Sequence, residues 1–289
     1  MKTNYFFALL AFLSITFWAC QPSGKTEENA AAGKNGTEQT EQPAAANPDA
    51  MTNNGITLTP VTNSPEFADA RLVLKAPADK AMLKDTTVKF DFDVENYQLG
   101  SQTPDAGQKM CANSDKGQHL HIILNNEPYL AYYESEFTKG LPEGNYVLLS
   151  FLSRSYHESL KHKEAATIST FTVGKPKTKP DFDVNAEHLF YSRPKGEYIG
   201  EANIKKILLD FYLLNCTLTP EGKRVLAKIN NSSFTLTKWQ PYFIEGLPEG
   251  ETTISLQLID KDGNVVPGPY NSVTRTIKLH KDEPVIEKK

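Results

Sequence analysis

Two of the chain's six histidines stand two residues apart, in the run His119-Leu120-His121. Alternate residues of a β-strand face the same side, so both imidazoles would project together. Leu120, Ile122 and Leu124 alternate with them and occupy the core-facing positions, which places the histidines on the outward face of the strand. Neutral imidazole is a common ligand of zinc and copper. The pair therefore predicts either part of a metal site or two solvated histidines on an exposed sheet.

A second group of histidines lies in the segment 153–163, before the last apolar strand pattern of the same region. It contributes His157 and His162. If this segment approaches the first pair, four imidazoles meet, with Met110 and Cys111 close in sequence. Imidazole suits zinc and copper, and methionine or cysteine sulfur favours Cu(I). We therefore expect a copper or zinc site formed by His119, His121, His157 and His162.

The same segment carries enough positive charge and hydroxyl groups to bind an anion. Arginine can give two parallel hydrogen bonds to a carboxylate or phosphate, and serine hydroxyls add further donors. The residues of this second type of site would be Ser153, Arg154, Ser155, Lys161 and Lys163. The segment thus has two interpretations, a metal site through its histidines and an anion site through its cations.

These residues belong to one of two copies of a repeated unit. The pentapeptide Gly-Leu-Pro-Glu-Gly occurs at 140–144 and again at 246–250. Self-similarity at a fixed spacing predicts two copies of one structural unit. The histidine pair is specific to the first copy, because the matching positions of the second hold Arg224 and Leu226. We place the first domain at residues 67–174, a linker at 175–185, the second domain at 186–280 and a charged tail at 281–289.

Both copies have the pattern of short antiparallel strands. Residues 88–94 alternate strictly between apolar and polar side chains, as half-buried strands do. Asn125-Asn126 and Asp262-Gly263 supply residues suited to tight turns. About seven short strands in roughly 100 residues are typical of an immunoglobulin-like sandwich. The predicted fold class is all-β, with two tandem immunoglobulin-like β-sandwich domains.

The N-terminus has the pattern of an exported protein. Lys2 precedes an almost wholly apolar run, and residues 1–19 end on a small alanine, which predicts a secretory signal peptide. The cysteine that follows, Cys20, makes this segment resemble the lipobox of bacterial lipoproteins. The resemblance implies a lipid on Cys20 that anchors the chain in the cell envelope, and we expect the outer membrane. Export would permit a disulfide between Cys111 and Cys216, which the sequence leaves open.

Residues 20–66 separate the predicted anchor from the first domain. Residues 21–66 contain no aromatic side chain and are rich in Ala, Glu, Gln, Asn, Thr and Pro. Such a composition buries too little apolar surface to offset the entropy of ordering, so a disordered linker is expected after the lipidated cysteine. The net charge of −4 gives the chain no electrostatic footprint for nucleic acid.

Two further resemblances concern the ligand. Gly117-Gln118-His119-Leu120-His121, a Leu-Pro-x-Gly turn and Tyr156-His157 resemble a His-rich periplasmic Ig-like domain family of unknown function over residues 117–173. The whole chain resembles flavobacterial lipoproteins that carry a loose phosphopeptide-binding label. These resemblances imply, respectively, a histidine-based ligand site on the first domain and a phospho-ligand partner.

No hydrolase, metalloprotease, P-loop or dinucleotide-binding motif occurs in the sequence, so we expect no enzyme. The favoured function is a membrane-anchored, non-enzymatic binding protein of the cell envelope with a copper or zinc site on domain 1. The alternatives are a phosphopeptide-, anion- or protein-binding adaptor that uses the basic 153–163 loop, and a structural subunit of an envelope complex.

Overall fold

The computed structural model describes residues 47–176 and 182–282, all within one compact unit. The predicted signal peptide 1–19, Cys20 and most of the charged tail lie outside the described residues, as does the middle of the predicted 175–185 linker. Among the described residues, no helix is long and apolar enough to cross a membrane.

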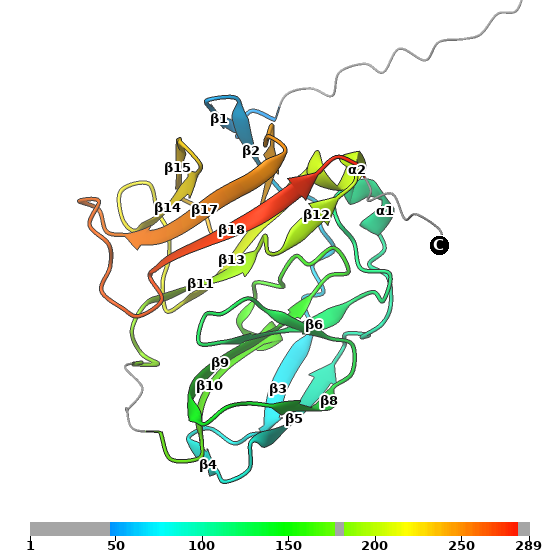
Figure 1. Cartoon of the computed structure of the whole chain (residues 1–289), viewed down its shortest axis with the longest axis vertical. Helices are drawn as coiled ribbons and strands as arrows, with labels where there is room; N and C mark the ends of the chain where they lie inside the picture. Colours follow the sequence, from blue (N-terminus) through cyan, green and yellow to red (C-terminus); the bar gives the residue numbers. More distant parts are fainter. Residues whose placement is uncertain (1–46, 177–181, 283–289) are drawn as a thin grey trace, which may run out of the picture. The chain divides into compact units, whose positions relative to one another are not determined.

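The first sandwich packs a five-stranded sheet, in the order β4-β10-β9-β6-β7, against a three-stranded sheet, in the order β3-β5-β8 (Figure 1). The strand predicted at 88–94 is confirmed within β5. The strands are β3 (Arg71–Ala76), β4 (Ala81–Leu83), β5 (Thr87–Glu95), β6 (His119–Leu124), β7 (Leu130–Tyr132), β8 (Glu136–Gly140), β9 (Gly144–Ser153) and β10 (Ala166–Val173), with single turns of helix at α1 (Ala106–Lys109) and η1 (Lys163–Ala165).

The second sandwich repeats this topology strand for strand. Its sheets have the orders β12-β18-β17-β14-β15 and β1-β2-β16-β13-β11, so each strand of the first sandwich has a counterpart eight strands later. The predicted duplication and the all-β fold of two tandem immunoglobulin-like sandwiches are confirmed. The elements are β11 (His188–Arg193), β12 (Glu197–Ile199), α2 (Glu201–Ile204), β13 (Ile207–Leu214), β14 (Arg224–Ile229), β15 (Ser232–Leu236), β16 (Tyr242–Glu245), β17 (Gly250–Ile259) and β18 (Ser272–His280).

Two strands have no counterpart in the first sandwich, and they come from the predicted linker. β1 (Met51–Asn53) and β2 (Ile56–Pro60) form a hairpin, and β2 pairs antiparallel with β16. The prediction of disorder for residues 20–66 is therefore wrong for residues 47–66, while residues 20–46 lie outside the described residues. Although the segment lacks aromatic side chains, Ile56 and Leu58 alternate with threonines and enter the second core, and the edge of β16 supplies backbone partners.

The outer face of the large sheet of the first sandwich packs on the second sandwich. Along β6 and β9, alternate side chains fill the first core, and those between them contact β11 and β13. Ile123, Leu149 and Phe151 thus cluster with Phe190 and Tyr212, all at most 5% exposed. The Phe151 and Tyr212 rings stack with centroids 5.2 Å apart. The face that carries His119 and His121 is consequently covered by the second copy.

The N-terminal hairpin gives the first test. Leu58 is fully buried, so Leu58→Ala should lower the free energy of unfolding by about 2–5 kcal/mol. Thr57→Ala, in the same strand but facing outward, should cost less than about 1 kcal/mol. Urea denaturation of the full chain measures both changes. Equal and negligible effects would show that the hairpin does not belong to the folded core.

Candidate metal centre

The histidine pair lies inside the protein. His119 and His121 begin β6, and both side chains are fully buried. The prediction that they face solvent is wrong, because the second sandwich covers that side of the sheet. The His121 ring stacks on Tyr129 at 3.8 Å between centroids, and Tyr133 lies beside His119 at 5.1 Å.

His157 comes to the pair from the turn after β9. The backbone N–H of Arg154 donates to the carbonyl of Glu158, and the N–H of His157 donates to the carbonyl of Arg154. This closes a tight turn in which His157 adopts a left-handed conformation with φ of 70°. A non-glycine residue there costs roughly 1–2 kcal/mol of backbone energy.

The second copy builds the same turn with different residues. The N–H of Asp260 donates to the carbonyl of Asn264, and the left-handed position is Gly263 with φ of 87°. At the strand position that matches His119, Arg224 donates through Nη2 to the carbonyls of Asp260 and Lys261. The fold therefore brings the start of this strand to this turn in both copies. The first copy places imidazoles at both positions.

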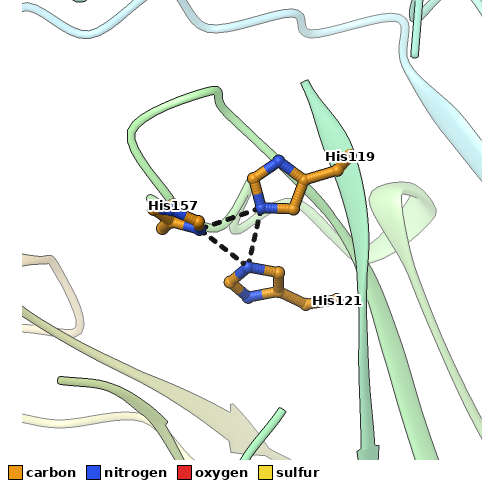
Figure 2. A group of neighbouring side chains, drawn as sticks. All are labelled: His119, His121 and His157. Atoms are coloured by element: carbon orange, nitrogen blue, oxygen red, sulfur yellow. Dashed lines mark hydrogen bonds between the residues drawn. The ribbon is translucent and has the colours of Figure 1, made fainter. Parts of the chain in front are cut away.

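The three imidazoles point at one another (Figure 2). His119 Nε2 lies 2.9 Å from His121 Nε2 and 3.0 Å from His157 Nδ1, and the third separation, between His121 and His157, is 3.5 Å. A point equidistant from the three nitrogens lies about 1.8 Å from each, slightly less than the Zn–N distance of roughly 2.0–2.1 Å. An ion bound at that distance would lie about 1 Å outside the plane of the three nitrogens.

Hydrogen bonds between the rings cannot satisfy this arrangement. His119 Nδ1 lies 2.8 Å from the carbonyl oxygen of Gly117, which only accepts, so Nδ1 carries the proton of the neutral ring. His119 Nε2 then carries one lone pair and no proton, and two nitrogens, one of His121 and one of His157, lie at hydrogen-bond distance from it. At most one of these contacts can be a linear hydrogen bond. A shared cation would satisfy all three nitrogens, and the Gly117 contact is the outer support that metal-bound histidines usually have.

Burial keeps the cluster neutral. It lowers the pKa of His119 to about 4 and the pKa values of His121 and His157 well below the usual histidine value. The positive charges of Arg193 and Lys195 lower all three pKa values further. All three rings are therefore uncharged at neutral pH, as metal ligation requires.

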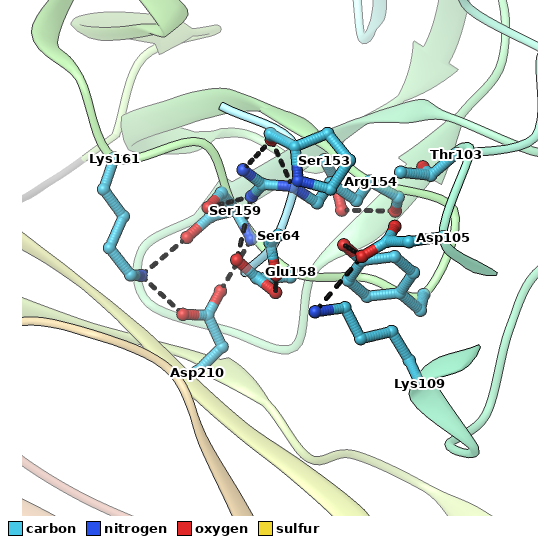
Figure 3. Close-up of polar contacts among 12 residues, drawn as sticks. Ser64, Thr103, Asp105, Lys109, Ser153, Arg154, Glu158, Ser159, Lys161 and Asp210 are labelled. Atoms are coloured by element: carbon cyan, nitrogen blue, oxygen red, sulfur yellow. Dashed lines mark hydrogen bonds and ion pairs between the residues drawn. The ribbon is translucent and has the colours of Figure 1, made fainter. Parts of the chain in front are cut away.

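The residues predicted to bind an anion instead hold the turn in place (Figure 3). Arg154 Nη1 forms an ion pair with Glu158 Oε1 at 2.9 Å, and both side chains are about 7% exposed. The Arg154 guanidinium also donates to the carbonyl of Pro65, and the Ser64 hydroxyl donates to Glu158 Oε2 at 2.8 Å. The charge of Arg154 is thus neutralised within the protein.

The second half of the segment is fixed by the other sandwich. Lys161 Nζ lies 2.6 Å from Oδ1 of Asp210, a fully buried residue of β13, and the N–H of Ser159 donates to Oδ2 of the same carboxylate. Ser153 and Ser155 are fully buried, and Ser155 exchanges hydrogen bonds with Thr103. Of the three predicted cations, only Lys163 is exposed. These contacts do not leave a cationic cradle open to solvent.

The remaining predicted ligands lie elsewhere. His162 Nε2 contacts the carbonyl of Ala70 at 2.8 Å, so His162 does not join the other three histidines. Met110 is 75% exposed, and Cys111 packs with Val61, Leu208 and Phe243. Among the described residues, Cys111 and Cys216 are free thiols, and burial raises the pKa of each to about 11. The site is therefore formed by imidazole nitrogens, without sulfur.

Several residues of the site were not predicted from the sequence. Tyr129 covers His121, and its hydroxyl lies 3.4 Å from His157 Nδ1. Arg193, from β11, donates to that hydroxyl. Arg193 is the last residue of the fully buried strand β11 and precedes a proline, so its sequence context resembles an ordinary strand end. The packing of the two copies brings it to the site, and nothing in the linear sequence encodes that contact.

No protein-family model and no curated protein matches the chain. Among solved structures, it is similar to the fibronectin(III)-like modules of Clostridium thermocellum CbhA, at 11% identity and a TM-score of 0.24 over 75% of this chain and 97% of that one. SGBP-B of the Bacteroides ovatus mixed-linkage glucan utilization locus matches at 12% identity and a TM-score of 0.23, over 72% of this chain and 47% of its own length. Similarities at this level carry no argument about function.

The buried histidines predict acid sensitivity of the metal-free protein. Their folded pKa values lie below the unfolded value of about 6.5, so between the two the unfolded chain binds more protons. Their contribution to stability is complete above about pH 6.5 and is lost as the pH falls, toward about 4 for His119. Denaturation at about pH 7.5 and about pH 5 should show this loss, and His119→Phe should reduce it. An unchanged pH dependence in that variant would contradict the assignment.

The left-handed conformation of His157 allows a substitution that removes the imidazole with little effect on the stability of the fold. His157→Gly places in the first copy the residue that the second copy has at Gly263, and it relieves the backbone strain. The metal-free variant should keep its free energy of unfolding within about 1 kcal/mol. It should lose the thermal stabilisation that added Zn²⁺ gives to the wild type. Full retention of that stabilisation would exclude His157 as a ligand.

Proposed function

We propose that the protein binds a single transition-metal ion through His119, His121 and His157. The observation that carries this proposal is the convergence of three nitrogen lone-pair positions, 2.9 to 3.5 Å apart, that ring-to-ring hydrogen bonds cannot satisfy. The internal repeat supports it, because the matching positions of the second copy serve a purely structural contact. Imidazole at these positions is an addition that the fold itself does not need.

The ligand set favours zinc or copper. Three imidazoles suit Zn²⁺, Cu⁺ and Cu²⁺, whereas Mg²⁺ and Ca²⁺ prefer oxygen. The positive charges of the buried Arg193 and the partly buried Lys195 oppose a further positive charge, which favours an ion whose fourth ligand is anionic. His157 is the most accessible ligand, so the ion would enter past the 154–158 turn.

The cell-envelope location forms part of the same proposal. It rests on the signal-peptide pattern of residues 1–19 and on Cys20, whose lipid would anchor the two sandwiches to a membrane, with the outer membrane as the expected one. A buried ligand set on a duplicated β-sandwich suits metal binding or sensing in the envelope, and the sequence contains no catalytic motif. We therefore propose a non-enzymatic metal-binding lipoprotein.

Calorimetric titration of the full chain in detergent with Zn²⁺, and competition titration with Cu⁺ under reducing conditions, test the proposal. We expect one ion per chain. His119→Ala and His121→Ala should each weaken binding at least tenfold, since loss of even an outer-shell partner costs about 10–100-fold. His162→Ala is the matched control and should bind as the wild type does, because its ring contacts the Ala70 carbonyl. Unchanged affinity in the first two variants would refute the site.

A further inference from the structure

Arg193 and Lys195 lie beside the histidine cluster, Arg275 lies near Lys195, and none of the three forms an ion pair with any carboxylate that the structure describes. Arg193, Lys195 and Arg275 are close enough for each arginine to lower the pKa of Lys195, which falls to about 8 mainly through burial. Among the described residues, no acidic side chain lies within ion-pair distance of any of the three. Arg193 is only 5% exposed. A buried charge without a counter-ion is costly in a folded protein.

Two of these cations line a surface pocket of about 290 Å³ between β11, β12 and α2. Two of the residues that line it carry a buried polar atom without a hydrogen-bond partner among the described residues, namely Nε of Arg193 and the hydroxyl of Tyr198. Asn113, Asn203 and the exposed Glu197 line it as well. The residues that line the pocket therefore include hydrogen-bond donors without an acceptor and cations without an ion-pair partner in the part of the chain that the structure describes.

We propose that this pocket binds a small oxyanion, a phosphate or carboxylate group, between Arg193 and Lys195. An anion supplies the missing counter-charge, and the unpaired Nε of Arg193 and hydroxyl of Tyr198 belong to side chains that line its pocket. The volume accommodates such a group with several waters, at roughly 30 Å³ for each water. This site differs from the anion site predicted in the 153–163 loop, whose Arg154 and Lys161 already have carboxylate partners.

The pocket adjoins the metal centre and does not depend on it. Arg193 Nη1 donates to the hydroxyl of Tyr129, which lies 3.4 Å from His157 Nδ1. The other cation of the pocket, Lys195, donates through Nζ to the carbonyl of Tyr129, and this nitrogen lies 3.8 Å from the centroid of the Tyr129 ring. The anion's partners come from β11, β12 and the loops around them, so they remain in place when the histidines are metal-free.

Calorimetric titration of the metal-free full chain with inorganic phosphate, and separately with acetate, at constant ionic strength tests the site. We expect one anion to bind per chain. Whichever of phosphate and acetate binds with the higher affinity identifies the group that the pocket prefers. Lys195→Gln should weaken binding about tenfold through loss of one charged donor. Glu197→Gln should tighten anion binding, because it removes a repelling carboxylate from the pocket lining.

Lys205→Gln is the matched control, since Lys205 is 70% exposed, pairs with Glu201 and lies outside the pocket wall. His121→Ala separates this proposal from the metal site, because it should abolish metal binding and leave phosphate binding intact. Absence of binding by both anions, or equal affinity in the wild type, Lys195→Gln and Lys205→Gln, would overturn the proposal.

Discussion

The packing of one sandwich face on the other is the interaction on which the rest of the structure depends. Ile123, Leu149 and Phe151 of the first sandwich meet Phe190 and Tyr212 of the second, and this contact closes the face that also carries His119 and His121. Removal of water from that face lowers the histidine pKa values, because burial disfavours the charged imidazole. The same contact brings Arg193 of β11 to the site. The second sandwich thus buries a sheet face that would be exposed to solvent in the first sandwich alone.

The 153–163 segment stabilises this arrangement through buried ion pairs. Arg154 and Glu158 close the turn that presents His157, and Lys161 joins the turn to Asp210 of the other sandwich. Buried ion pairs add little net stability, because the cost of desolvation offsets their attraction. Removal of one partner, however, leaves the other charge buried and unpaired, which is strongly destabilising. The two ion pairs specify a single position for the turn. The positive charges of Arg154 and Lys161 therefore serve architecture, whereas Arg193, Lys195 and Arg275 form no ion pair among the described residues.

Much of this could be predicted from local sequence. The alternation in β5, the repeated pentapeptide and the two-residue spacing of His119 and His121 depend on neighbours along the chain, and each was confirmed. The burial of the histidines was predicted wrongly, because alternation shows which side chains share a face and cannot show what covers that face. The β1–β2 hairpin was missed for a related reason, since its partner β16 lies in the distant second copy. His162 was assigned to the site because it lies in the same segment as His157, but its ring contacts the Ala70 carbonyl instead.

X-ray absorption spectroscopy at the metal edge of the zinc-loaded full chain tests the central claim most directly. The account predicts three imidazole nitrogens at about 2.0–2.1 Å with one further light ligand and no sulfur, because the site contains three histidines and Cys111 lies outside it. A spectrum with a sulfur shell, or with fewer than three imidazoles, would contradict it. Either result would mean that His119, His121 and His157 converge for packing alone.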